Sequence, residues 1–181
     1  MSGIRARALV VAVATSSIVL GAGCAHEPAI GSGKVCTATG FASPYATVDP
    51  CSGEAVLRAA VAAVFTYQPQ IQADQRVAFQ HAKPLLDPAF AAAGESAATV
   101  FTPITAARWQ EWRTQLVSVT ATARITGDDH PPDTATLMSR VLGVDLHLGE
   151  ASPAMRFAVY AHVTRSGLSS PWLVAALEVT G

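Results

Sequence analysis

The hydrophobic pattern of this chain changes its period once, near residue 115, and that change decides the fold class. Between Pro50 and Gln115, apolar residues recur three to four positions apart, as they do on one face of a helix. From Val117 to Val179 they alternate with polar residues, as in strands that have one buried face. Helices followed by a run of strands predict an α+β domain in which N-terminal helices pack on a curved antiparallel sheet.

Four helices are predicted before residue 115. Proline suits the first turn of a helix and disfavours helical backbone in the residue before it, so the proline dipeptides mark helix ends. Thr105 is a suitable N-cap for the last helix, which carries Trp109 and Trp112 on one face, and we expect Trp109 in the core. The first three helices are expected from Asp49-Pro50 to a stop at Gln68-Pro69, over residues 73–82 with a stop at Lys83-Pro84, and after Asp87-Pro88.

Four strands are predicted after residue 116. Side chains two apart in a strand share a face, so Asp145 with His147, and Tyr160 with His162, should point away from the more apolar faces that form the core. The second strand is long, and Gly143 is the expected site of a bend or bulge. The strands are expected at about 117–125, 135–148 and 155–164 and from Pro171-Trp172 to Val179, with a turn over 126–133.

The N-terminus has the pattern of an export signal. Two arginines precede an apolar run from Leu9 to Leu20, and the run ends at Gly21-Ala22-Gly23-Cys24. Small residues before a cysteine resemble the lipobox of bacterial lipoproteins, which implies that residues 1–23 are a signal peptide and that Cys24 carries diacylglycerol. Gly21 departs from that pattern, which prefers leucine there. A short transmembrane anchor or an ordinary signal cut nearby are the alternatives, although the run is shorter than the ~20 residues that span a bilayer.

With Cys24 assigned to lipid, Cys36 and Cys51 remain as a pair. Two such cysteines in an exported protein predict a disulfide. They lack C-x-x-C redox spacing, and no second cysteine pair or nearby histidine couple completes a zinc site. Residues 24–50 have no hydrophobic period and are interrupted by proline and glycine, so we expect a tether there, its second half pinned by the disulfide, and a single domain over 51–181.

The composition argues against nucleic-acid binding. Removing the signal takes Arg5 and Arg7 from the 12 basic residues and leaves all 13 acidic ones, so the mature chain is slightly negative. Lys34 and Lys83 are the only lysines, and alanine is abundant, which is typical of a GC-rich genome and suggests an actinobacterium. Nothing in the sequence indicates a cofactor.

The order of the parts resembles the nuclear-transport-factor-2-like superfamily, a cone-shaped α+β fold that includes ketosteroid isomerases and SnoaL-type cyclases. The resemblance covers roughly residues 51–181 and rests on the helical hairpin, the Trp109-Gln110-Glu111-Trp112 helix and the long strands that end at Pro171-Trp172-Leu173-Val174. More narrowly, the chain is similar to small exported or membrane-anchored members of that fold in actinobacteria, some encoded near conjugative-transfer or type IV secretion genes. The resemblance implies either an assembly module or a small-molecule site inside the cone.

Enzymes on that fold use an aspartate base with tyrosine and protonated aspartate donors in an apolar pocket. His81 lies near a helix end, where a positive charge suits the dipole, so we expect it at the surface. The acidic turn lacks the ligand alternation of a calcium loop, so we expect a solvated hairpin and no metal. The catalytic candidates are Tyr67, Asp74, His81, Asp145, His147, Tyr160 and His162, and the acidic turn holds Asp128, Asp129, His130 and Asp133.

No nucleophile elbow, P-loop or zinc-binding helix motif occurs in the chain. We therefore expect a non-catalytic lipoprotein on the extracytoplasmic face of the cell membrane, held by lipid on Cys24 and bound to an envelope protein, in a transfer or export apparatus. The alternative is a small-molecule carrier or an isomerase-like enzyme. A cavity lined by inward polar groups favours the alternative, whereas a filled cone with an exposed apolar patch favours the protein partner.

Overall fold

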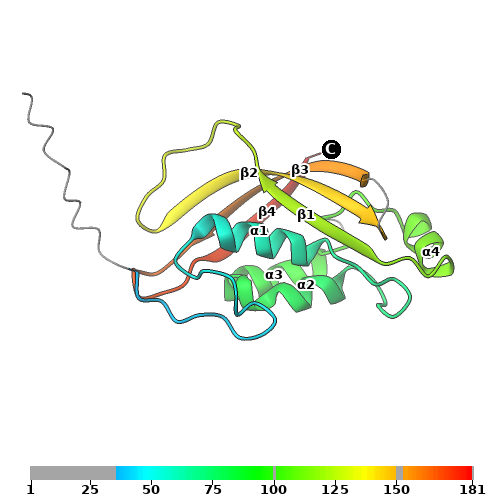
Figure 1. Ribbon diagram of the computed structural model, residues 1–181, viewed down its shortest axis with the longest axis horizontal. Helices are drawn as coiled ribbons and strands as arrows, with labels where there is room; N and C mark the ends of the chain where they lie inside the picture. The colour runs from blue at the N-terminus through cyan, green and yellow to red at the C-terminus, as the bar shows by residue number, and fades with distance from the viewer. Residues whose placement is uncertain (1–35, 100, 150–152, 181) are drawn as a thin grey trace, which may run out of the picture. The chain divides into compact units, whose positions relative to one another are not determined.

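The computed structural model describes residues 36–99, 101–149 and 153–180, so the predicted signal and Cys24 lie outside the described residues. In the described part, helices come first and a sheet follows, which confirms the α+β class (Figure 1). The helices are α1 (Gly53–Val64), α2 (Arg76–Ala82), α3 (Pro88–Ala97) and α4 (Ala106–Thr114), with a 3₁₀ turn at Lys83–Leu85. The strands are β1 (Val119–Ile125), β2 (Leu137–Leu148), β3 (Pro153–Thr164) and β4 (Leu173–Thr180).

The strands form an antiparallel meander in chain order, and the sheet of the described residues is open, with β1 and β4 as its edges. The predicted bulge at Gly143 is wrong, because this residue stays in register with Arg124 on β1 and with Ala158 on β3. The β2–β3 register shifts instead between Leu146 and His147, close to the end of the hairpin. Regular pairing holds around Gly143 because the flanking positions on β2 are buried in the core.

The core fills the space between α1 and one face of the sheet. The apolar face predicted for α1 is buried throughout, and the inward residues of β2 and β3 meet it. Phe65, just after α1, packs edge-on against Phe157 of β3 with ring centroids 5.0 Å apart. The predicted strand facing is confirmed, since Val159 is fully buried while its neighbour Tyr160 is half exposed on the opposite face.

α1 begins three residues later than the sequence predicts, and it ends at Val64, before the predicted stop at Gln68-Pro69, because Tyr67 already pairs with Val119 of β1. Its N-cap is Ser52, whose hydroxyl accepts a hydrogen bond from the Ala55 amide at 3.2 Å. Asp49 instead accepts from the Cys51 amide at 2.9 Å and closes the turn before the helix. The predicted helix start was wrong because Asp49 caps the preceding turn and not the helix.

α2 is shorter than predicted for the same reason. The Asp74 carboxylate accepts a hydrogen bond from the Arg76 amide at 2.9 Å, which holds residues 73–75 in a turn. The predicted stop at Lys83-Pro84 leads into the 3₁₀ turn. The start predicted for α3 after Asp87-Pro88 is confirmed, with Asp87 as its N-cap, and so is the predicted N-cap of α4, Thr105.

Residues 36–50 pack on the domain instead of forming a free tether. The Cα atoms of Cys36 and Cys51 lie 5.7 Å apart, so this pair is capable of the predicted disulfide. The Trp172 amide donates to the Pro50 carbonyl at 3.0 Å, and Phe41, Tyr45 and Val48 pack against the core. The packed domain thus includes the segment from Cys36 onwards. This packing could not be predicted, because the segment has no hydrophobic period.

Candidate functional site

The Tyr67 side chain lies in the core and faces no carboxylate. It is fully buried, and its ring packs edge-on against Trp109, with centroids 5.5 Å apart. Burial raises the pKa of the Tyr67 hydroxyl well above its usual value, so the group stays protonated at neutral pH. Among the described residues this hydroxyl has no hydrogen-bond partner, and the same holds for the indole N–H groups of Trp109 and Trp112. The predicted core position of Trp109 is confirmed.

Asp74 does not join Tyr67 in an acid–base pair. Its carboxylate is bound by the Arg76 guanidinium, which lowers the pKa of Asp74 through hydrogen bonds. His81 lies exposed in the last turn of α2, as predicted, and its carbonyl accepts a hydrogen bond from the Tyr45 hydroxyl at 3.0 Å. These three candidates therefore do not come together in one site.

A groove of about 610 Å³ runs over the outer side of α1, between α2 and the segment around Tyr45. Burial raises the pKa of the Tyr45 hydroxyl, which donates to the His81 backbone. Alanines form much of its wall, and the full lining is Pro44, Tyr45, Ala59, Ala62, Ala63, Thr66, Gln68, Gln72 and His81. This groove could not be predicted from the sequence, because Tyr45 lies in the segment expected to be a tether.

Asp145 and His147 lie on the outer face of the sheet, as predicted. The Asp145 carboxylate is paired with Arg124 at 2.9 Å and with Arg156 at 3.2 Å, across the two neighbouring strands. A ring nitrogen of His147 lies 3.4 Å from the Thr122 hydroxyl oxygen. A carboxylate held between two arginines is part of a surface ion-pair cluster rather than a free general base.

Tyr160 and His162 line a cleft of about 300 Å³ on the outer face of β2–β4, which we call the sheet cleft. Side chains aligned across neighbouring strands come within contact distance, so two cross-strand rows form its floor. The turn after β1 forms its wall. The strand candidates Tyr160 and His162 and the acidic turn, which are separate groups in the sequence, therefore meet at this cleft. The rows are Val141–Tyr160–Glu178 and Ser139–His162–Ala176, and the wall is Asp129, His130 and Pro131.

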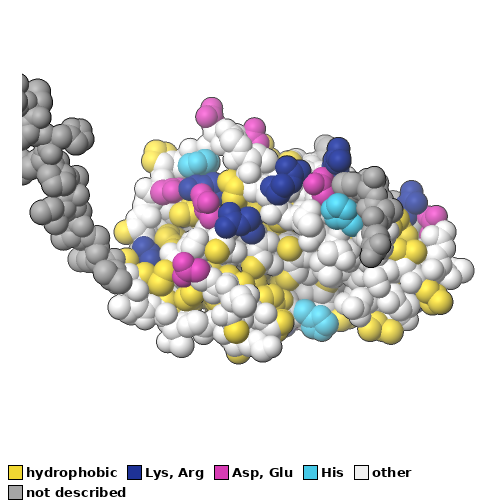
Figure 2. All heavy atoms as spheres, viewed as in Figure 1, with side chains coloured by type: hydrophobic (Ala, Val, Ile, Leu, Met, Phe, Trp, Pro, Cys, Tyr) yellow, Lys and Arg dark blue, Asp and Glu magenta, His cyan; other side chains and the backbone are white. Residues whose placement is uncertain are grey.

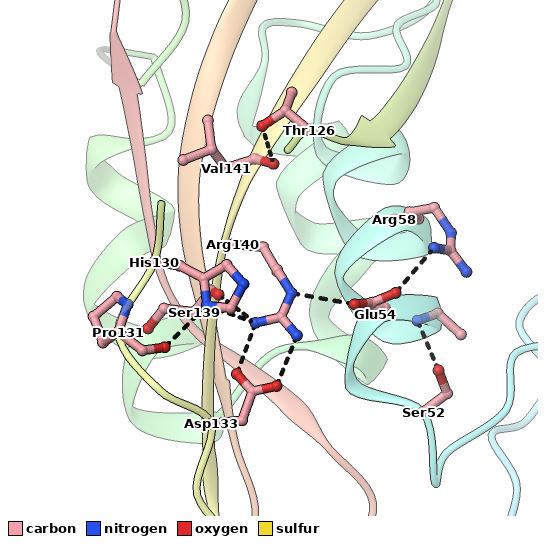
Figure 3. A network of polar contacts seen from close by, with 11 residues as sticks. Ser52, Glu54, Arg58, Thr126, His130, Pro131, Asp133, Ser139, Arg140 and Val141 are labelled. Atoms are coloured by element: carbon pink, nitrogen blue, oxygen red, sulfur yellow. Dashed lines mark hydrogen bonds and ion pairs between the residues drawn. The ribbon is translucent and has the colours of Figure 1, made fainter. Parts of the chain in front are cut away.

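Arg140 holds this wall in place (Figure 3). Its side chain is nearly buried at 9% exposure, and its two terminal nitrogens each donate to an Asp133 oxygen at 2.7 Å. Its Nε donates to Glu54 on α1 at 3.2 Å, and Nη1 also donates to the Ser139 carbonyl at 2.7 Å. Arg140 therefore ties the turn to α1 and to β2, and it lowers the pKa of Asp133 by hydrogen bonding.

The turn also covers an otherwise unpaired part of β2. β1 pairs with β2 only as far as Leu142, which leaves residues 137–141 without a neighbour on that side. The Thr126 amide donates to the Val141 carbonyl at 3.0 Å, and the Thr134 amide donates to the Leu137 carbonyl at 2.9 Å. The turn is exposed to solvent over residues 127–137, as predicted, and these bonds together with Arg140 also dock it on the strand.

One sequence signal could have revealed this docking. Along β2, Arg140 alternates onto the same face as Leu142 and Val144, which point into the core. A guanidinium that is nearly buried requires carboxylates nearby. Asp145 is closer in the sequence but lies at an odd spacing on the same strand and so on the opposite face, which leaves the acidic turn as the nearest source of carboxylates. Within the described residues, no three His, Cys, Asp or Glu side chains are grouped so that they could hold a metal ion.

A second surface lies at the end of the domain formed by residues 68–75 and 113–118, which we call the tip. Arg113 of α4 donates hydrogen bonds to the carbonyls of Pro69 at 2.8 Å, Ala73 at 3.0 Å and Gln72. Gln70 donates to the Ser118 hydroxyl at 3.3 Å. These bonds fasten the 68–75 connection to the C-terminal end of α4, as the adjacent positions in Figure 1 show.

The tip presents two of the most exposed large apolar side chains in the described part of the chain. Ile71 is 76% exposed and Leu116 is 74% exposed. α4 ends in a Schellman motif, in which the Leu116 amide bonds the Arg113 carbonyl and the Val117 amide bonds the Trp112 carbonyl. Leu116 has φ 54°, a left-handed conformation that glycine normally supplies at this position. Apolar side chains are visible at this end of the molecule in Figure 2.

No family model, characterised protein or solved structure matches this chain. In the described ranges, no helix combines the length and the apolar character needed to cross a membrane.

Proposed function

We propose that this protein is a lipid-anchored, non-catalytic lipoprotein of the cell envelope whose tip binds a membrane-associated protein partner. The observation that carries the proposal is the conformation and exposure of Leu116. A left-handed leucine costs about 1–2 kcal/mol relative to ordinary backbone, and here it places an apolar side chain in solvent. Local packing gains little from this arrangement, whereas an apolar recess on a partner would gain the buried surface.

The tip is also held rigid. Arg113 binds three carbonyls of the 68–75 connection, so Ile71 and Leu116 are fixed on one support. A pre-organised apolar pair loses less conformational entropy on binding than a flexible one. Because Ile71 and Leu116 are both exposed and rigidly held, they are suited to bind a defined surface of a partner protein.

The described chain begins at the end of the domain opposite the tip, where α4 and the 68–75 connection lie (Figure 1). If Cys24 carries the lipid, the segment from residue 25 to 35 extends at most about 40 Å. The tip is then available to a neighbouring envelope protein, and a transfer or export apparatus is the concrete form that we propose.

The finer fold assignment belongs to this proposal. A nuclear-transport-factor-2-like origin accords with the helices before the meander and with the cover that α1 provides on one sheet face. The isomerase-like alternative requires a carboxylate beside a phenol donor. In the described structure Asp74 is paired with Arg76 and Tyr67 has no hydrogen-bond partner, so the partner-binding function is supported better.

The test is crosslinking and affinity capture of the full chain from intact membranes, followed by mass spectrometry. We expect Ile71→Asp and Leu116→Asp to abolish one specific crosslinked membrane protein. Both side chains are exposed, so neither variant should unfold the domain. Leu137→Asp is the matched control, because Leu137 is an exposed leucine on β2, outside the tip. Equal capture by the tip variants and the control would reject the proposed interface.

A further inference from the structure

We propose that the sheet cleft binds a single organic cation, a guanidinium or alkylammonium group on an aliphatic stem. Glu178 and Asp129 supply the counter-charge, and Tyr160 supplies an aromatic face. The proposal concerns a different surface from the tip and does not depend on it. Its basis is a concave site in which several polar groups converge without partners of their own.

The carboxylates of the sheet cleft are uncompensated. Among the described residues, Asp129 and Glu178 form no ion pair or hydrogen bond through their side chains. The arginine that lines the cleft is matched, because Arg140 and Arg58 share Asp133 and Glu54 in one network. Further along the outer face, Arg124 and Arg156 both pair with Asp145. The cleft therefore favours a positively charged occupant.

The floor and the wall suit a cation with an apolar stem. Tyr160 is half exposed and stands between Val141 and Glu178 in its row, so an aromatic ring lies next to a carboxylate. A cation can contact the ring face and the carboxylate together. Val141 and Ala176 give the floor apolar patches that a methylene stem can cover.

The size of the cleft selects a small group. At about 300 Å³ it lies at the lower end of the range for small-molecule sites, which is about 300–1,000 Å³. This volume accommodates one side-chain-sized cation. Arg140 keeps the shape fixed, since its bonds to Asp133 and Glu54 dock the wall before any ligand arrives.

The test is an NMR titration of the full chain in detergent at about pH 8 with N-acetyl-arginine methylamide. N-acetyl-citrulline methylamide is the matched neutral probe, because it replaces the guanidinium with a urea of the same shape. We expect saturable amide shifts around Tyr160, His162 and Glu178 with the arginine probe alone. Equal binding of both probes, or shifts confined to other surfaces, would overturn the proposal.

Variants separate the charge from the fold. Glu178→Gln should weaken binding about tenfold, as expected for one hydrogen bond to a charged group. Tyr160→Leu should weaken it by a smaller factor through loss of the aromatic face. Glu111→Gln on α4 is the control and should bind as the unmodified chain does. Unchanged affinity in Glu178→Gln, with an otherwise unaltered amide spectrum, would also overturn the proposal.

The source of the cation is decided by two further probes. Agmatine carries the guanidinium without a peptide backbone, and a pentapeptide with a central arginine carries it within a chain. Tighter binding of agmatine supports the proposal with a free small cation as the ligand. Tighter binding of the peptide supports it with a basic side chain of a protein as the ligand. Failure of both probes to bind rejects the site.

Discussion

The left-handed backbone at Leu116 should reverse the usual order of stability of an alanine and a glycine substitution. At most exposed positions outside a turn, alanine is more stable than glycine by roughly 0.5–1 kcal/mol, because glycine loses more backbone entropy on folding. At φ 54° alanine still bears the left-handed cost of about 1–2 kcal/mol, and glycine does not. We therefore expect Leu116→Gly to be more stable than Leu116→Ala by about 0.5–1 kcal/mol.

The comparison with the unmodified chain follows from exposure. Leu116 is 74% exposed, so it keeps only about a quarter of the roughly 1.5–3 kcal/mol that full burial of a leucine provides. Loss of that part, together with the entropy cost of glycine of about 0.5–1 kcal/mol, nearly offsets the backbone relief of about 1–2 kcal/mol in Leu116→Gly, whose stability should stay within about 0.5 kcal/mol of the unmodified chain. Loss of partner capture by this variant would then reflect lost contact rather than unfolding.

Urea denaturation of the full chain, followed by circular dichroism, measures these differences. Leu137→Gly and Leu137→Ala form the control pair, because Leu116 is the one described non-glycine residue with positive φ. Alanine should be the more stable substitution at position 137 and glycine at position 116. Alanine equal to or better than glycine at position 116 would refute the strain on which the proposed function depends.

Three further predictions concern the anchor, the cysteine pair and the docked turn. Cys24→Ala should leave the protein unanchored or unprocessed, and mass spectrometry of the membrane-extracted N-terminus checks this; unmodified Cys24 in the mature chain would contradict it. Reduction of Cys36–Cys51, which are 15 residues apart, should cost about 3 kcal/mol, while alkylation of both thiols before reduction would exclude the disulfide. Arg140 lowers the pKa of Asp133 below its model-peptide value of 3.8, so its stabilisation is present above about pH 4 and is lost as pH falls through the lowered value. Asp133→Asn should therefore lose less stability than the unmodified chain between pH 5 and pH 2 in urea titrations, and equal losses would contradict this.

The order of elements could be predicted because hydrophobic period is a local signal. Alternation placed Tyr160 and His162 on the face opposite Val159, and the structure confirms that facing. Helix starts were less accurate. Asp49 and Asp74 can cap either a turn or a helix, and only the tertiary arrangement decides which amide each one binds.

The candidate surfaces could not be predicted, because each joins residues far apart in the chain. The sheet cleft depends on Arg140, which docks the acidic turn over a part of β2 that β1 does not reach. The tip depends on Arg113, which binds carbonyls about 40 positions earlier. Backbone carbonyls leave no mark in a sequence pattern, and the left-handed backbone at Leu116 is hidden because leucine gives no local turn signal.

Site-specific photo-crosslinking in intact cells tests the central claim most directly. A photoreactive amino acid is placed in the full chain at position 71, at position 116 or, as a control, at position 137. The account predicts a crosslink to the same membrane-associated protein from positions 71 and 116 and none to that protein from position 137. Absence of crosslinks from the tip, or the same products from all three positions, would contradict it.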